Sequence, residues 1–397
     1  MVFKHKLTIF SVLLGTGIIL SATTVVLSAQ TTQQIDNLLQ KLKSNQLVER
    51  ESAAWALGGF KAPRSIGALI ETLADSSPSV RRVSAWALGE IGDARSINAL
   101  ADSLRDTDPT VRSAAVWALL KIKDKKVLNH LAKALNDKNL SVRCDIINAL
   151  GELRYQEAAK YLIPYLKDSN ALVRSFTARA LGKISANISE IHLISTLNDK
   201  EETVRNDAAW ALGEIKGPNS VKPLIKLLKD SSILVAGTAA ASLGNIKNEN
   251  AVKPLLDLIL DKNTDIYISV NALRALGNIK SNIAVSPLLA NLNNKDNKLK
   301  TEMIKVLGIL KDKKAVPVLI DLLIDENIEI RTETARALGN IRDTNAIPPL
   351  ISSLNDADMQ EKAVYVEALR NITRQSFGIN HNDWKHWWEE NKLWYGH

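Results

Sequence analysis

The sequence predicts an all-α fold, an α-solenoid of about eleven stacked two-helix repeats, each of about 31 residues. The phrase Ala-Trp-Ala-Leu-Gly occurs at 54–58, 85–89 and 209–213. Aligned on its glycine, the chain repeats at the spacing of Gly58 to Gly89, with a single longer step from Gly244 to Gly277. A fixed period of this size is the signature of a solenoid. The aligned positions are Gly58, Gly89, Leu120, Gly151, Gly182, Gly213, Gly244, Gly277, Gly308, Gly339 and Arg370.

Each repeat has the pattern of a helix pair. Residues 64–75 place four aliphatic side chains at helical spacing, and Pro78 then marks a turn. A second amphipathic helix follows over about 80–91, with small residues on its apolar face that let neighbouring helices approach closely. Gly89 lies opposite that face, near the end of the helix, where a small flexible residue is useful. No segment alternates polar and apolar residues with a period of two, so we expect essentially no strand.

Two charged columns accompany the repeat. An aspartate occupies the predicted turn between the two helices, where it is suited to capping the second helix. A basic residue follows six positions later and can reach the aspartate of its own or an adjacent repeat, so we expect a ladder that links repeats. Its members are Asp75, Arg81, Asp106, Arg112, Asp137, Arg143, Asp168, Arg174, Asp199, Arg205, Asp325 and Arg331.

The ladder is interrupted near the one longer step. Ala236 and Ser269 stand in the basic column, and Asn294 stands in the aspartate column. Three consecutive repeats therefore lack a complete pair of their own. Because the stability of a solenoid is close to a sum of repeat and neighbour terms, we expect residues 230–300 to bend or open more easily than the flanking repeats.

The repeat pattern also resembles a known family. The unit L-x-D-x-x-x-x-V-R-x-x-A-A-x-A-L-G-x-I is matched by LADSSPSVRRVSAWALGEI at 73–91 and by LNDKEETVRNDAAWALGEI at 197–215. It is similar to the short HEAT-like repeat named after the phycobilisome lyases, over about residues 33–372. The resemblance implies stacked helix pairs whose second helices line a concave groove. It leaves function open, since the family includes chromophore lyases, adaptors, scaffolds and exported proteins.

A column three residues before the repeat glycine should then face the groove. Tryptophan stands there in the N-terminal half, and basic residues replace it further along. The tryptophans form either an aromatic binding floor or covers that lie flat over the seams between repeats. The basic positions could take an acidic segment or be an ordinary solvated face. The groove candidates are Trp55, Trp86, Trp117, Trp210, Arg179, Arg274, Lys305 and Arg336.

The repeat ends before a tryptophan-rich segment at 374–397. Trp384, Trp387 and Trp388 share one helical face. Because the last repeat of a solenoid must cover its open end, we interpret the segment as a cap. Its pattern F-G-x-x-x-x-x-W-x-x-W-W resembles the tail of exported bacterial HEAT-repeat proteins.

The segment 1–29 differs from the rest of the chain. A short basic start precedes an apolar stretch over 7–27, and no acidic residue occurs before Asp36. We predict an export signal, either a cleaved signal peptide or a retained membrane anchor, because an apolar stretch of roughly 20 residues is enough to cross a bilayer. The remaining chain, with the solenoid at 30–373, is then periplasmic or otherwise extracytoplasmic, or is anchored to the cytoplasmic membrane.

No catalytic or metal-binding constellation is evident, and we expect no cofactor and no enzymatic activity. The single cysteine, Cys144, excludes an intrachain disulfide framework, and no His-Glu pair or phosphate-binding loop appears. The net charge of +8 falls to about +6 from Gln30 onward, which does not by itself indicate nucleic acid. We expect an exported scaffold that binds a protein or peptide partner in its groove, where an acidic segment would suit the basic positions. The alternative, implied by the resemblance, is a lyase-like protein that holds a tetrapyrrole there.

Overall fold

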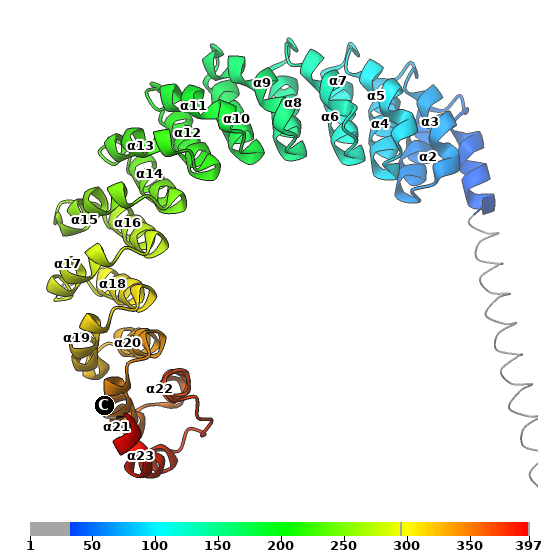
Figure 1. Cartoon of the computed structure of the whole chain (residues 1–397). Coiled ribbons are helices and arrows are strands. Elements are labelled where there is room, and N and C mark those ends of the chain that lie inside the picture. Colours follow the sequence, from blue (N-terminus) through cyan, green and yellow to red (C-terminus); the bar gives the residue numbers. More distant parts are fainter. Residues whose placement is uncertain (1–31, 294–295, 396–397) are drawn as a thin grey trace, which may run out of the picture. The chain divides into compact units, whose positions relative to one another are not determined.

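The computed structural model describes residues 32–293 and 296–395 (Figure 1). Within these residues the regular structure is helical and no strand occurs, which confirms the predicted all-α fold. The second helices of eleven repeats are present in the described ranges. The predicted export segment at 1–29 lies outside them.

The chain forms two compact units, Met1–Leu162 and Ile163–His397, called unit 1 and unit 2 below. In each unit the first helices of the repeats form one layer and the second helices another (Figure 1). The second helices are α2 (Leu47–Gly59), α4 (Pro78–Ile91), α6 (Pro109–Ile122) and α8 (Leu140–Leu153) in unit 1, and α10 (Ala171–Ile184), α12 (Glu202–Ile215), α14 (Ile233–Ile246), α16 (Ile266–Ile279), α18 (Asn297–Leu310), α20 (Ile328–Ile341) and α22 (Met359–Thr373) in unit 2.

The first helices are shorter, and most begin with a 3₁₀ turn. They start at a helix over 32–41 in unit 1. The others are α3 (Ile66–Thr72), α5 (Ile97–Ser103), α7 (Val127–Lys133) and α9 (Ala159–Leu162) in unit 1, and α11 (Glu190–Thr196), α13 (Val221–Leu227), α15 (Val252–Leu260), α17 (Val285–Ala290), α19 (Val316–Asp321) and α21 (Ile347–Asp356) in unit 2.

The repeat glycine has a different role from the one expected. Gly89 is buried, and a Cβ atom built on it would lie 2.7 Å from the Cα of Ala118 in the next repeat. Gly58 meets Ala87 at the same distance. The glycine therefore lets two second helices touch backbone to backbone. The interpretation of Gly89 as a helix-terminating residue is wrong, because the helix continues to Ile91 and is followed by Gly92 in the left-handed conformation.

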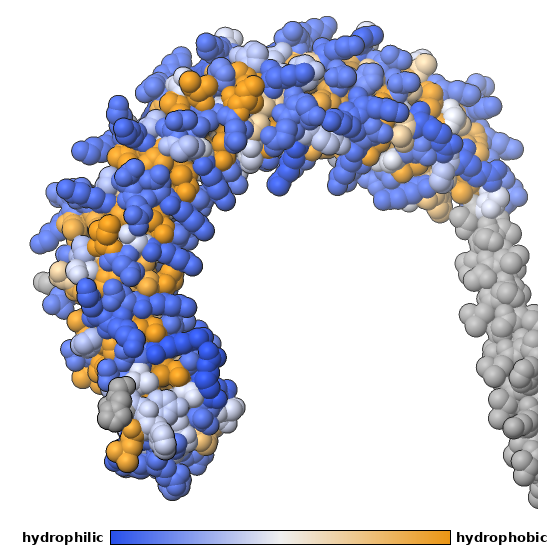
Figure 2. Space-filling view, in the orientation of Figure 1, coloured by the Kyte–Doolittle hydropathy of each residue, from blue (hydrophilic) through white to orange (hydrophobic). Residues whose placement is uncertain are grey.

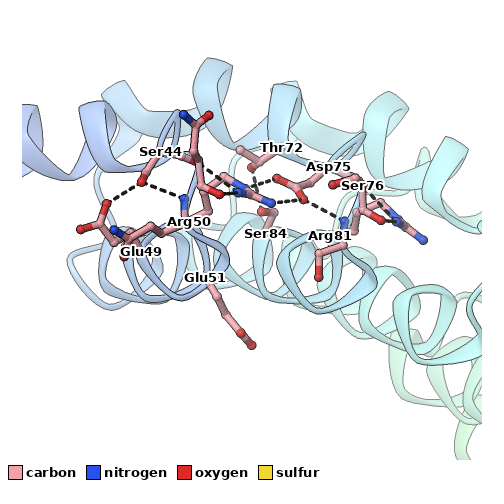
Figure 3. Close-up of polar contacts among 12 residues, drawn as sticks. Ser44, Glu49, Arg50, Glu51, Thr72, Asp75, Ser76, Arg81 and Ser84 are labelled. Carbon is pink, nitrogen blue, oxygen red and sulfur yellow. Dashed lines mark hydrogen bonds and ion pairs between the residues drawn. The ribbon is translucent and has the colours of Figure 1, made fainter.

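The charged ladder runs forward along the chain. Arg81 donates from Nε and Nη2 to the carboxylate of Asp106 in the next repeat, at 2.7 and 2.8 Å. Its Nη1 donates to the backbone carbonyls of Asp75 and Ser76 in its own turn, at 2.9 and 3.3 Å. Figure 3 shows the preceding rung, Arg50 with Asp75. One guanidinium thus holds two consecutive turns together.

The same forward contact recurs in both units. Arg50 and Lys300 belong to it although the sequence analysis did not include them. In the last pair the acceptor is a glutamate, Glu361 on α22. The pairs are Arg50–Asp75, Arg81–Asp106 and Arg112–Asp137 in unit 1, and Arg174–Asp199, Arg205–Asp230, Lys300–Asp325 and Arg331–Glu361 in unit 2. Arg143 donates to the carbonyl of Asp137, and Asp168 accepts from Asn170 N–H, each within its own unit.

The ladder aspartate does not cap the second helix, which corrects the expectation. Its carboxylate accepts the N–H two residues further on, as in Asp106 with Asp108 at 2.8 Å. That later residue is the N-cap, and Asp108 in turn accepts from Thr110 N–H. The aspartate therefore shapes the turn, while both of its carboxylate oxygens also accept from the arginine of the preceding repeat.

Because each rung runs forward to the next repeat, the interruption of the ladder is shorter than expected. Asp230 pairs with Arg205 of the preceding repeat, so this rung is present. The missing contacts are those of Ala236 toward Asp261 and of Ser269 toward the next turn, because neither residue carries a cation. Two successive interfaces, and not three repeats, lack the rung. The greater opening of residues 230–300 stays a prediction.

The last repeat is covered by α23 (His381–Tyr395), which packs against α21 (Figure 1). Trp384 is fully buried, donates from Nε1 to the carbonyl of Gly378 at 2.9 Å, and contacts Phe377 edge-on. Trp387 is buried beside it, and Trp388 is half-buried. Three tryptophans on one helix thus cover apolar surface at this end of unit 2.

The glycine seam predicts opposite outcomes for two similar substitutions. Gly89→Ala should lower the free energy of unfolding by about 2–3 kcal/mol, because the new methyl meets the backbone of Ala118. Gly67→Ala is the matched control, since a Cβ there has nothing within 4 Å; it should stabilise by about 0.5–1 kcal/mol. Urea unfolding followed by circular dichroism measures both. Equal effects would contradict the seam.

The ladder predicts a pH dependence. The hydrogen bond from Arg81 lowers the pKa of Asp106 below the ordinary 3.8. Because the folded pKa is lower than the unfolded one, the contribution is complete above the unfolded pKa and is lost as the pH falls through the folded value. Asp106→Asn should cost about 2 kcal/mol at pH 7, and this cost should decrease as the pH falls below the unfolded value of 3.8. Asp102→Asn, on α5 outside the ladder, is the control. A pH-independent cost would contradict the ion pair.

Candidate binding surface on the second helices

Three tryptophans stack along the second helices of unit 1. The rings of Trp55 on α2 and Trp86 on α4 have centroids 6.2 Å apart and lie 9° from parallel. Trp86 and Trp117 on α6 follow at 6.5 Å and 17°. The period of the repeat places them at one position of successive helices, and the close glycine seam brings those helices within stacking distance. We call these three residues the tryptophan stack.

The indoles also cover the seams. The Cζ3 atom of Trp86 lies 2.8 Å from the place where a Cβ on Gly58 would be, and Trp117 has the same relation to Gly89. Trp86 and Trp117 are accordingly half-buried. Each of these two rings therefore packs against the preceding repeat. The tryptophan column thus covers the seams, and the sides of the rings that face away from the seams are the part that could form a binding floor.

The first member of the stack is open. Trp55 is 62% exposed. Beside it lies a cavity of 590 Å³ between α2 and α4, and both Trp55 and Trp86 line it. Its other lining residues are Val48, Glu51, Ser52, Arg82 and Val83. Figure 2 shows that apolar side chains reach the surface in patches between hydrophilic ones. Trp55 adds an exposed aromatic ring beside a cavity with room for a ligand group.

The polar groups of this cavity are partly engaged. Glu51 pairs with Arg82 at 3.7 Å and accepts from the hydroxyl of Ser79 at 3.2 Å. At the other end of the stack, the Nζ atom of Lys121 lies 5.1 Å from the ring centroid of Trp117, in a cation–π contact. Lys121 thus contacts the ring at one end of the stack, and the ring of Trp55 at the other end is exposed to solvent.

Trp210 is on α12, in unit 2, and has no aromatic neighbour in its column there, where Arg179 and Ala241 stand in the adjacent repeats. Its ring covers Gly182. The guanidinium of Arg179 donates to the buried carboxylate of Asp207 at 2.9 Å. Asp207 also accepts a short hydrogen bond from Ser175. Trp210 and Arg179 therefore act in packing and in a polar network of their own.

The basic positions further along lie beside carboxylates. Arg274 and Lys305 both contact Glu302 at 3.3 Å, and Arg336 contacts Glu333 at 3.4 Å. The sequence analysis missed these carboxylates, although Glu302 and Glu333 each stand one helical turn before a basic residue of the column. The basic residues of this half are therefore paired in part with acidic side chains of the second helices. That they take an acidic segment stays a prediction.

Two other kinds of feature are absent from residues 32–293 and 296–395. No group of three or more His, Cys, Asp or Glu side chains there is arranged to hold a metal ion. No helix in those ranges is both long and apolar enough to cross a membrane. Cys144 is buried on α8.

A family model described as HEAT repeats matches most of the chain. The chain belongs to the HEAT-repeat family. The matched segments are 35–120, 68–143, 128–212, 162–233, 190–274, 221–302 and 285–370. No curated protein matched the sequence.

Solved structures share this HEAT-repeat fold. A mutant of Kap121p is 14% identical with a TM-score of 0.62, and the match covers 86% of this chain and 46% of that one. Kap95p, whose structure concerns binding to RanGDP, is 14% identical with a TM-score of 0.60, over 87% of this chain and 55% of that one. The chain spans about half the length of these two proteins. At such identities the likeness shows the fold alone.

The complex of CpcE and CpcF of phycocyanin lyase from Nostoc sp. PCC7120 is also similar. It is 22% identical, and the match covers 62% of this chain and 93% of that one, with a TM-score of 0.35. So low a score carries no argument about function.

Proposed function

We propose that this HEAT-repeat protein is an exported, non-enzymatic scaffold that binds a peptide segment of a protein partner at the tryptophan stack. The observation that carries the proposal is the open ring of Trp55 beside the cavity between α2 and α4. Buried tryptophan anchors dominate the binding energy of many interfaces, and this ring is positioned without being buried. Because packing at the seams already holds the rings in place, binding would cost little side-chain conformational entropy.

The lining indicates which segment would fit. Trp55, Trp86, Val48 and Val83 present apolar surface, which suits an aromatic or branched aliphatic side chain. Glu51 and Arg82 add one group of each sign. A partner segment with an apolar anchor flanked by polar residues matches this lining better than a strongly acidic one. The paired Arg274, Lys305 and Arg336 give no further reason to require an acidic partner.

The test is peptide binding by matched variants. A displayed peptide library panned on the purified protein should yield peptides with an aromatic or aliphatic anchor. Trp55→Ala should weaken their affinity at least 10-fold, because it removes the exposed ring. Trp210→Ala is the control: it removes a tryptophan from the same column that covers a seam but stacks on no other ring. Equal loss in both variants, or no loss with Trp55→Ala, would contradict the proposal.

The free energy of unfolding distinguishes an exposed ring of the stack from one that covers a seam. Trp55→Ala should change the free energy of unfolding by less than about 1 kcal/mol, since the ring is exposed. Trp86→Ala should cost about 2 kcal/mol, because it uncovers Gly58.

A linear tetrapyrrole is the competing ligand. If it binds with a change in absorbance that Trp55→Ala abolishes, while no peptide binds, the lyase-like alternative replaces the scaffold.

Export is part of the same proposal. It rests on the basic start and the apolar stretch at 7–27. Protease added to intact spheroplasts should digest the protein. A cytoplasmic marker protein in the same sample should remain intact. Digestion only after lysis would show that the chain stays inside the cell.

A further inference from the structure

A basic residue follows each of five successive second helices of unit 2. It is the C-cap of its helix, and its backbone N–H donates to the carbonyl four residues earlier, at 3.0 or 3.1 Å. The helices α12, α14, α16, α18 and α20 lie side by side, so that these residues stand along one edge of the unit (Figure 1). The five residues, which we call the basic row, are Lys216, Lys247, Lys280, Lys311 and Arg342.

The backbone of the basic row is in the left-handed conformation, with φ angles from 57° to 62°. A Cβ atom makes this conformation unfavourable, and glycine or asparagine usually follows a helix in it. Gly92 has this place after α4 in unit 1. The helix dipole favours a cation near this helix end, but a cation within the last turn would benefit without a left-handed backbone. Five cations at these positions therefore have a backbone cost that glycine would avoid.

The side chains of the basic row are all exposed. Within the described residues none of them forms an ion pair or a side-chain hydrogen bond. The two carboxylates that directly follow members of the row are engaged in their own turns. Asp312 accepts from Lys314 N–H at 2.9 Å, and the buried Asp343 accepts from Asn345 N–H and pairs with Lys313 at 3.2 Å. The cationic groups of the row are thus available to an anionic partner.

The surroundings of the basic row are also cationic. The five segments around the helix ends contain seven lysines and arginines and four aspartates and glutamates, so that this edge has a net positive charge. The segments are 214–219, 245–250, 278–283, 309–314 and 340–345.

Two isoleucines are exposed among these cations. Ile309 precedes Lys311 on α18 and is 44% exposed, and Ile283 follows Lys280 and is 63% exposed. Surfaces that lie on a membrane combine cations, which attract anionic headgroups, with apolar side chains that enter the boundary between headgroups and acyl chains. The edge has both kinds of side chain.

We propose that the basic row docks unit 2 on a membrane surface that carries anionic lipids. Packed helices are separated by about 8–10 Å, so five cations, one per repeat, extend over roughly 35 Å. A lipid surface offers phosphate groups at any spacing, whereas an acidic protein segment would have to present its carboxylates in this register. The exposed isoleucines also suit lipid better than they suit an acidic segment.

This contact is separate from the tryptophan stack, because the stack lies in unit 1 and binds a peptide, while the basic row lies in unit 2 and binds headgroups. The docking of unit 2 therefore stands or fails independently of the proposed function.

The test is the rate at which lysine side chains of the full chain are acetylated by a soluble reagent on vesicles. Vesicles of phosphatidylcholine are compared with vesicles that also contain phosphatidylglycerol, and mass spectrometry gives the rate at each lysine. The four lysines of the basic row should react about 3-fold or more slowly on the anionic vesicles, because headgroups cover them. Added salt should reduce this protection.

The internal controls are exposed lysines on or beside the first helices of the same unit, and their rates should be alike on both vesicles. They are Lys222, Lys226, Lys229 and Lys253. Because the apolar stretch at 7–27 is the same in every sample, the comparison of lipids isolates the effect of headgroup charge. Equal rates for the basic row on both vesicles, or equal protection of the control lysines, would overturn the proposal.

Two variants of equal charge locate the contact. One replaces all five residues of the basic row by asparagine. The other replaces five exposed lysines elsewhere in unit 2 by asparagine, namely Lys200, Lys222, Lys226, Lys229 and Lys253.

Lys314, an exposed lysine at the edge of the basic row, is the reporter in both variants. Its protection on anionic vesicles should be lost in the first variant and kept in the second. Equal loss would show that overall charge, and not the row, attracts the lipid. If soluble polyglutamate protects the row of the wild type as well as anionic vesicles do, the row recognises an acidic protein segment and the lipid proposal is wrong.

The melting temperature tests the backbone argument without any lipid. Lys280→Gly should melt at a higher temperature than the wild type, because glycine adopts a φ of 60° without strain. Lys253→Gly, in the first turn of α15, should melt at a lower temperature, because glycine is a poor helix former. A lower melting temperature for Lys280→Gly would show that lysine stabilises this helix end, and the argument that the row is kept for a ligand would be wrong.

Discussion

The close approach of successive second helices is the constraint on which the other features depend. Gly58 and Gly89 each face the Cα atom of an alanine in the next repeat, at a distance that no side chain would allow. This contact sets the spacing of the repeats within a unit. The spacing in turn brings Trp55, Trp86 and Trp117 within stacking distance, and it places the turns within reach of an arginine side chain. The close packing at the seams thus determines the contacts made by both the aromatic and the charged column.

The ladder adds direction to this packing. Each guanidinium binds the carbonyls of its own turn and the carboxylate of the following turn, so that it stabilises an interface and not a single repeat. The loss of a rung is therefore a property of an interface as well. Ala236 and Ser269 leave two neighbouring interfaces without a cation, and the acceptors that remain at Asp261 form the wall of a cavity.

The second-helix face combines stability and recognition in the same residues. Trp86 packs against the seam at Gly58 with one part of its ring and lines the cavity beside Trp55 with another. Along the other unit, carboxylates such as Glu302 pair with the basic residues that seemed available for a partner. In unit 1 the exposed part of the tryptophan stack is its first ring, Trp55.

The sequence alone determined the repeat, its helix pairs and the identity of the charged columns, because a fixed period repeats the same local pattern many times. It also placed Trp55, Trp86 and Trp117 in one column. Only the tertiary structure decided what each column touches. The role of Gly89, the forward direction of Arg81 and the pairing of Arg274 with Glu302 all depend on distances between neighbouring helices, which periodicity does not contain. The missing cation at Ser269 is visible in the sequence, but only the tertiary structure shows a cavity lined by this residue.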